Sequence, residues 1–148
     1  MLVDTNVLVS AHDPRDRPKP ERALGVLDRL IGSGRAVLSA HCRSECFVVV
    51  TRRLPAPLAP AEALAQVDRL ARACRVLDVT AAVVLEGCRG SAHHGLALWD
   101  ALIWAAARPN QEPAVLTEDP PHGRRLEGVR FLNPFAAEFD LSLLDGRT

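Results

Sequence analysis

The chain opens with Met1-Leu2-Val3-Asp4-Thr5-Asn6, in which a short apolar run ends at a carboxylate. A second run, Ala114-Val115-Leu116-Thr117-Glu118, ends in the same way at Asp119. Short apolar runs are typical of buried strands. In open α/β sheets, ligands bind beyond the carboxyl ends of the strands. The two acids are therefore predicted to lie at the same edge of one sheet.

The sequence around these runs alternates between strand-like and helix-like patterns. Further strands are predicted at residues 36–38, 76–79 and 130–132. Helices are predicted from Val7 onward and over residues 21–31, 39–53, 61–73, 81–92 and 99–107. Thr5 or Asn6 is expected to cap the first helix, and the proline-rich stretch 13–20 is expected to be a loop. The alternation predicts an α/β fold with a mainly parallel central sheet of about five strands, flanked by helices, in one domain over residues 1–148.

The composition argues against a disordered, a strongly basic, a membrane-spanning or a secreted protein. Its apolar fraction of 48% is enough for a core, and its 18 basic and 18 acidic residues argue against a strongly basic nucleic-acid coat. No apolar run reaches the roughly 18–20 residues of a membrane span, and the first residues lack the basic region of a secretory signal. Cys42 and Cys46 are four residues apart, but no second pair with zinc spacing follows. We expect a protein of the reducing cytoplasm with no membrane contact.

Two more acids, Glu45 and Asp100, lie inside mostly apolar helical stretches. An isolated carboxylate on a buried element is costly unless something pairs with it, and no basic residue is placed as an obvious partner for each acid. A shared cation would satisfy all four, and Mg²⁺ or Mn²⁺ fits best because both favour oxygen ligands. Asp4, Glu45, Asp100 and Asp119 are therefore the candidate catalytic and metal-binding residues.

The fourth acid is either Glu118 or Asp119, and side-chain alternation favours the second. Successive side chains of a strand point to opposite faces, so Asp119 shares its side with Val115 and Thr117 while Glu118 lies on the other. Each acid also has a purely structural explanation. The three aspartates can serve helix caps, helix dipoles or turns, and Glu45 can pair with an arginine of its own helix.

Four motifs occur in order along nearly the whole chain: Asp4-Thr5-Asn6, Glu45, Trp99-Asp100-Ala101-Leu102-Ile103 and Leu116-Thr117-Glu118-Asp119. Together they resemble the PIN domain. The closing segments Glu127-Gly128-Val129-Arg130 and Asn133-Pro134-Phe135 resemble the VapC branch of that family, the ribonuclease toxins of bacterial and archaeal toxin–antitoxin pairs. One departure is Pro120-Pro121-His122, where many members carry a further Asp and Phe.

The resemblance implies a Mg²⁺- or Mn²⁺-dependent endoribonuclease that hydrolyses RNA phosphodiester bonds, forms a homodimer and is neutralised by a VapB-type antitoxin protein. Asn6 and Thr117 match family positions that support the acidic site by hydrogen bonding. Two alternatives stay open. One is a PIN-like module that binds RNA or a protein without cleavage. The other is a phosphoesterase that acts on DNA or flap structures, although such relatives usually carry longer insertions and further acids.

Other residues near the acids are candidates for contacts with RNA. Arginine forks suit phosphate oxygens, and the candidates are Arg43, Arg52, Arg53, Arg124, Arg125 and Arg130. Tryptophan can stack on nucleobases. Trp99 and Trp104, however, occur at helical spacing among Ala, Leu and Ile, and they are therefore predicted to belong to the core.

Overall fold

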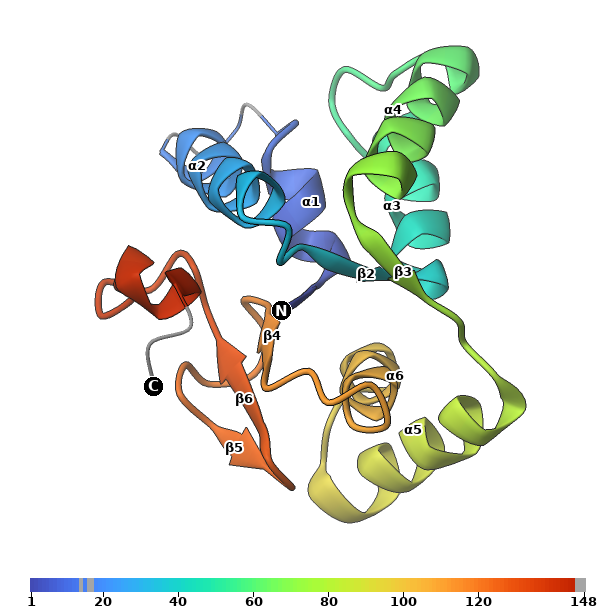
Figure 1. Cartoon of the computed structure of the whole chain (residues 1–148). Helices are drawn as coiled ribbons and strands as arrows, with labels where there is room; N and C mark the ends of the chain where they lie inside the picture. Colours follow the sequence, from blue (N-terminus) through green and yellow to red (C-terminus); the bar gives the residue numbers. More distant parts are fainter. Residues whose placement is uncertain (14, 16–17, 146–148) are drawn as a thin grey trace.

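The computed structural model describes residues 1–13, 15 and 18–145 of the chain. Within those residues, six strands form one sheet in the order β3-β2-β1-β4-β6-β5 (Figure 1). The strands are β1 (Leu2–Val3), β2 (Val37–Ser39), β3 (Arg75–Leu77), β4 (Ala114–Leu116), β5 (Arg125–Leu126) and β6 (Val129–Leu132). All neighbours pair in parallel except β5, which pairs antiparallel with β6. The predicted α/β fold with a mainly parallel sheet is confirmed.

Helices flank the sheet and supply most of the described chain. They are α1 (Thr5–Ser10), α2 (Lys19–Gly32), α3 (Ala40–Arg52), α4 (Pro60–Ala73), α5 (Ala81–His94), α6 (Leu98–Ala107) and the 3₁₀ helix η1 (Leu141–Asp145). In Figure 1, α1 to α4 lie on one side of the strands, and α5 and α6 lie on the other. Among the described residues, no helix combines the length and apolar character needed to cross a membrane.

Strand residues alternate between two hydrophobic clusters, one on each face of the sheet. Val3 and Leu116 pack with residues of α1, α2 and α3 in one cluster. Their neighbours Leu2 and Val115 pack with α6 in the other. Because a parallel sheet covered on both faces leaves no solvent side, its strands are apolar throughout. This explains why the short runs in the sequence show no polar alternation.

The register of the central strands brings the first and last thirds of the chain together. Leu2 lies opposite Val115, and Val3 lies opposite Leu116. The backbone N–H of Asp4 donates to the carbonyl of Leu116 at 2.9 Å, so the residues after β1 and β4 leave the sheet at the same edge.

Helices α5 and α6 pack closely because two glycines of α5 face α6. A Cβ atom at Gly87 would lie 2.7 Å from Leu102 Cδ2, and one at Gly90 would lie 2.7 Å from Trp104 Cζ3. Both glycines are buried, and because they carry no side chain, Leu102 and Trp104 of α6 lie directly against the backbone of α5. This packing fixes the helix that carries Asp100.

Two local predictions were wrong, on the cap of α1 and on the extent of the loop before α2. Asp4, and not Thr5 or Asn6, caps α1, and its carboxylate accepts a hydrogen bond from the N–H of Thr5 at 2.5 Å. The sheet of about five strands is confirmed, since five strands pair in parallel, and the two-residue β5 adds a hairpin with β6 across the turn at Glu127 and Gly128, both at positive φ. The predicted loop at 13–20 is shorter than expected because α2 begins at Lys19, and residues 14, 16 and 17 of that loop lie outside the described residues.

Candidate metal centre

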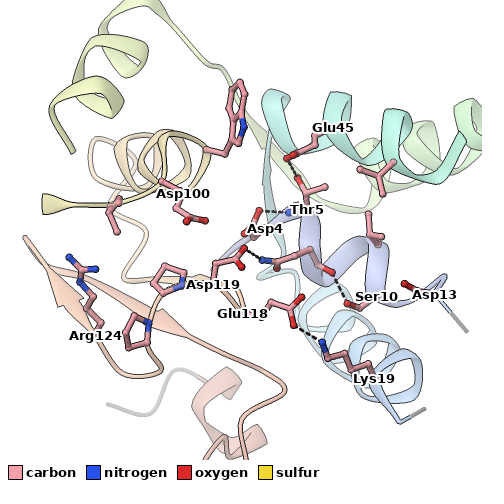
Figure 2. Close-up of a pocket in the computed structure, with 18 of the residues that line it drawn as sticks. Asp4, Thr5, Ser10, Asp13, Lys19, Glu45, Asp100, Glu118, Asp119 and Arg124 are labelled. Carbon is pink, nitrogen blue, oxygen red and sulfur yellow. Dashed lines mark hydrogen bonds and ion pairs between the residues drawn. The ribbon is translucent and has the colours of Figure 1, made fainter. Parts of the chain in front are cut away.

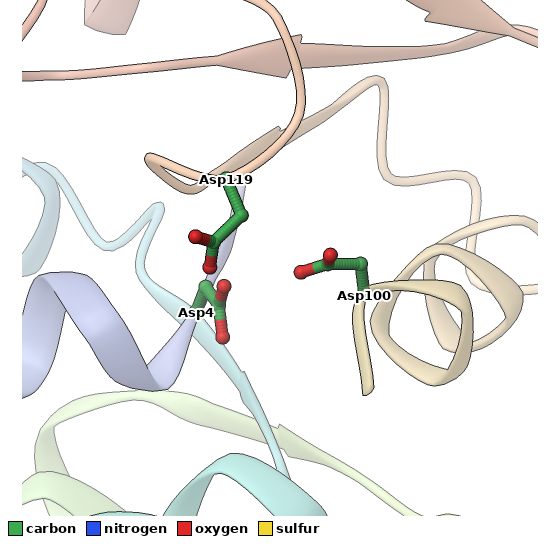
Figure 3. A group of neighbouring side chains, drawn as sticks. All are labelled: Asp4, Asp100 and Asp119. Atoms are coloured by element: carbon green, nitrogen blue, oxygen red, sulfur yellow. The ribbon is translucent and has the colours of Figure 1, made fainter. Parts of the chain in front are cut away.

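A cavity of about 910 Å³ opens at the carboxyl edge of the sheet. Three of the four predicted acids meet in it: one carboxylate oxygen each from Asp4, Asp100 and Asp119 lies within 4.8 Å of the others (Figure 3). Asp4 follows β1, Asp119 follows β4, and Asp100 lies in the first turn of α6. Among the described residues, no lysine or arginine forms an ion pair with any of the three.

Asp4 is the most buried of the three acids, with 5% of its surface exposed. Burial raises the pKa of its carboxyl to about 7, and the charges of Asp100 and Glu45 add to the rise. Hydrogen bonds from the Thr117 hydroxyl at 2.6 Å and the Thr5 N–H at 2.5 Å act in the opposite direction. The ionised form of Asp4 is therefore unfavourable in the folded protein, and the two hydrogen bonds offset only part of the free energy lost by burial.

Asp100 has the same electrostatic character in a more open position. Burial raises the pKa of its carboxyl to about 6, with further contributions from the charges of Asp119 and Glu45. Two neighbouring acids with raised pKa values indicate that the basic residues of the cavity wall do not compensate the burial of these carboxylates. A divalent cation would supply the missing positive charge.

A chain of hydrogen bonds orients two of the acids. The side-chain amide of Asn6 donates to Asp119 Oδ2 and to Thr117 Oγ1, both at 2.9 Å. Thr117 in turn donates to Asp4 Oδ2. The two residues that the family resemblance gave as supporting positions therefore connect Asp4 to Asp119 through direct contacts.

Glu45 and Glu118 occupy different positions from these three acids. Glu45 lies on α3, lines the cavity, and accepts a hydrogen bond from Thr5 Oγ1 at 2.8 Å (Figure 2), but it is not part of the group whose oxygens lie within 4.8 Å. Glu118 pairs with Lys19 at 2.7 Å. The contact from Thr5 was not predicted, and no periodicity in the sequence marks it because it joins the first turn of α1 to α3.

Comparison with known proteins identifies the family to which this fold belongs. The family model of the PIN domain matches residues 1–124. The chain belongs to the PIN domain family. This confirms the resemblance predicted from the four motifs. Among curated proteins, none matches the sequence.

Solved structures similar to this PIN domain include several toxins. A toxin–antitoxin complex from Klebsiella pneumoniae has a TM-score of 0.66 at 16% identity, with 90% of this chain and 97% of that chain covered. VapC20 from Mycobacterium tuberculosis, a sarcin–ricin loop cleaving toxin, has a TM-score of 0.60 at 24% identity, with coverage of 77% and 85%. The DNA-bound VapBC of Salmonella typhimurium has a TM-score of 0.61 at 20% identity, with coverage of 88% and 94%. At these identities the likeness shows a shared fold.

The two tryptophans of this PIN domain differ from each other. Trp104 is 1% exposed and belongs to the core, as predicted. Trp99 is 54% exposed, and the prediction that it is buried was wrong. It lies in the first turn of α6, ahead of the buried residues 101–107, and it lines the cavity with Asp100.

The arginine candidates also separate into two groups. Arg124 lines the cavity, and one of its guanidinium nitrogens donates to the carbonyl of His94 at 2.8 Å. Arg15 and Lys19 line the cavity as well. The other candidates do not belong to the described lining: they are Arg43, Arg52, Arg53, Arg125 and Arg130.

Proposed function

We propose that this PIN domain is a Mg²⁺- or Mn²⁺-dependent endoribonuclease toxin of the VapC kind, which hydrolyses RNA phosphodiester bonds. The observation that carries the proposal is the convergence of Asp4, Asp100 and Asp119 within 4.8 Å. The raised pKa values of two of these acids support it, because a cluster that resists ionisation is stabilised by a cation.

The donor set fits a hard divalent cation. Three carboxylates offer oxygen ligands only, as Mg²⁺ and Mn²⁺ prefer, and no cysteine belongs to the described cavity lining or to the three-acid group. In the proposal Asp4, Asp100 and Asp119 hold the ion, and Glu45 is a fourth acid that lines the same cavity. When bound, such an ion makes a water molecule a nucleophile near neutral pH and neutralises charge on the phosphate.

The residues of the chain have separate roles in this scheme. Asp4 and Asp100 lose their protons as the ion binds. Asn6 and Thr117 hold the carboxylates of Asp119 and Asp4 in fixed orientations through the hydrogen bonds described above. Glu45 lies outside the three-acid group and is the proposed acceptor of the proton from the attacking water.

Cations at the cavity wall are proposed to hold the phosphates that flank the scissile bond. Arg124 lies on the side of α6, while Lys19 lies on the side of α2 (Figure 2). Arg15 also lines the cavity. A single-stranded RNA that crosses the acids would meet positive charge on both sides.

The proposal extends to partners and setting. The Salmonella typhimurium and Rickettsia felis neighbours are VapBC complexes bound to DNA, which supports a VapB-type antitoxin as the partner of this chain. We also propose that the 148 residues form one PIN domain, that it acts as a homodimer and that it works in the cytoplasm.

An RNA cleavage assay with Asp100→Asn tests the proposed activity. The wild type is expected to cut a mixed RNA substrate in Mn²⁺ and to stop in EDTA, while Asp100→Asn shows no cutting above background. Asp28→Asn is the control, because Asp28 is an exposed acid of α2 outside the cavity lining, and it should cut at the wild-type rate. Undiminished cutting by Asp100→Asn refutes the assignment of the site. RNA that is bound and never cut by the wild type favours the binding-module alternative.

A further inference from the structure

The exposed indole of Trp99 is the feature of the cavity that the proposed hydrolysis leaves unused. Trp99 as a residue is 54% exposed, although the residues that follow Asp100 in α6 are all buried. Trp99 directly precedes Asp100 and lines the same cavity. Because Trp99 lines the cavity, a ligand bound at the acids could cover its exposed apolar surface and gain the free energy of that burial.

One face of the Trp99 indole is already in contact with another aromatic ring. The ring of His41 stacks on that of Trp99, with 5.0 Å between centroids and 16° between planes. His41 belongs to α3, and its Nε2 lies 3.5 Å from Glu45 Oε2 one helical turn on. The indole is therefore oriented by a contact from another helix, which lowers the entropy lost when a second ring stacks on it.

We propose that Trp99 is the stacking platform for an unpaired nucleobase next to the scissile phosphate, and that His41 is the residue that positions it. This inference rests on the proposed function, and it names the substrate class as single-stranded or looped RNA. Aromatic side chains stack on bases of any identity because every base has a π-face. The proposal thus gives the enzyme a preference for an unpaired base at one position.

The location of the ring favours RNA over a partner protein. Trp99 and Asp100 are consecutive, so a phosphate at the acids places the neighbouring base within reach of the indole. Arg124 lines the same cavity and can hold a phosphate of the same strand. A base within a duplex is already stacked and paired, so offering it to Trp99 requires unstacking, which costs a few kcal/mol.

Tryptophan fluorescence measures this stacking directly, because the chain has two tryptophans and Trp104 is buried. The protein is used as its Asp119→Asn form so that a short single-stranded oligoribonucleotide stays intact in Mg²⁺. Its emission should be quenched as the RNA binds. Trp99→Phe should lose the quenching, because only Trp104 then emits, and should keep most of the affinity through its phenyl ring.

Substitutions of the ring separate stacking from a structural role. Trp99→Leu, which keeps apolar bulk without a π-face, should bind the oligoribonucleotide about 5- to 150-fold more weakly, the equivalent of about 1–3 kcal/mol per stacked base. An abasic nucleotide at the stacked position should weaken binding to wild-type Trp99 and leave Trp99→Leu unaffected. His41→Ala should weaken binding less than Trp99→Leu does, since it removes the support and leaves the indole.

The outcomes distinguish this inference from the proposed activity. Quenching by RNA that the wild type never cuts would support the platform and refute the nuclease. Cutting at the wild-type rate and unchanged affinity in Trp99→Leu would refute the platform and leave the nuclease intact. If Trp99→Leu binds RNA normally and loses only its affinity for an antitoxin, the ring is a protein contact and the platform is likewise refuted.

Discussion

Replacing Asp4 by Asn should stabilise this protein at pH 8 in the absence of metal, although it removes a proposed metal ligand. The pKa of the carboxyl is raised from 3.8 to about 7, mainly by burial. At about 1.4 kcal/mol for each tenfold change, ionising Asp4 in the folded state costs about 4 kcal/mol. Asn carries no charge and avoids that cost.

Part of this gain is lost in the hydrogen bonds that Asp4 accepts. The amide oxygen of Asn can still accept from the N–H of Thr5, but its NH₂ group faces Thr117 Oγ1, which already accepts from Asn6. A mismatched buried contact of this kind costs about 1–2 kcal/mol. We therefore expect Asp4→Asn to be more stable than the wild type by about 2–3 kcal/mol at pH 8.

The sign of the difference should reverse at low pH. An acid with a higher pKa in the folded state binds its proton more tightly when folded, so the stability that it contributes is greatest below about pH 4 and is lost as the pH rises to about 7. At pH 4 the wild-type carboxyl is protonated and bears no cost. There Asp4→Asn retains only the mismatched contact and should be less stable by about 1–2 kcal/mol.

Urea unfolding at pH 4 and pH 8 in EDTA measures both differences, and Asp28→Asn on the exposed face of α2 is the matched control. Adding Mg²⁺ at pH 8 gives a second test. At a hundred times its dissociation constant, the ion should stabilise the wild type by about 2.7 kcal/mol and Asp4→Asn by much less. If Asp4→Asn is destabilised by the same amount at both pH values, the buried carboxylate is not strained and the electrostatic case for a cation site fails.

Three further outcomes follow from the geometry. Gly90→Ala should destabilise the fold by about 1–3 kcal/mol in urea unfolding, because the new Cβ would lie 2.7 Å from the buried indole of Trp104. The control Gly25→Ala, whose new Cβ would have nothing within 4 Å, should be neutral or stabilising. Equal effects of the two substitutions would contradict the close packing of α5 on α6. Thr117→Val removes a hydrogen-bond donor that lowers the pKa of Asp4. An infrared titration of the carbonyl region should therefore show that the Asp4 carboxyl keeps its proton up to a higher pH than in the wild type. An unchanged titration would mean that the hydroxyl contact is not formed. Mn²⁺ affinity in calorimetry should rise from pH 5 to pH 8, since Asp4 and Asp100 with pKa values of about 7 and about 6 must lose protons to bind; an affinity independent of pH would contradict this.

Much of the architecture was predictable because the strands are short, apolar and separated by helical patterns. The two runs ending at Asp4 and Asp119 did become neighbouring parallel strands, and parallel register alone brings those two acids to one edge. The choice of Asp119 over Glu118 followed from alternation, and the structure places Glu118 beside Lys19. These features depend on local periodicity, which a single sequence carries.

The features that escaped prediction depend on contacts between distant segments. Helix α6 is apolar on nearly every side, so its periodicity does not reveal which end remains uncovered, and Trp99 was wrongly assigned to the core. The hydroxyl of Thr5 reaches Glu45 on α3, a contact that requires the tertiary arrangement of two helices. Strand β5 has only two residues, which is too short for a periodic signal.

The position of β1 in the middle of the sheet has a consequence for protein synthesis. Strand β1 precedes the other described strands in the chain and lies between β2 and β4, and the backbone N–H of Asp4 donates to the carbonyl of Leu116, which is translated much later. Because chains emerge from the ribosome with the N-terminus first, a nascent chain that ends before residue 119 carries Asp4 without Asp119. In such a chain at most two of the three clustered acids, Asp4 and Asp100, have been made, so the proposed metal site cannot be complete before residue 119 has been synthesised.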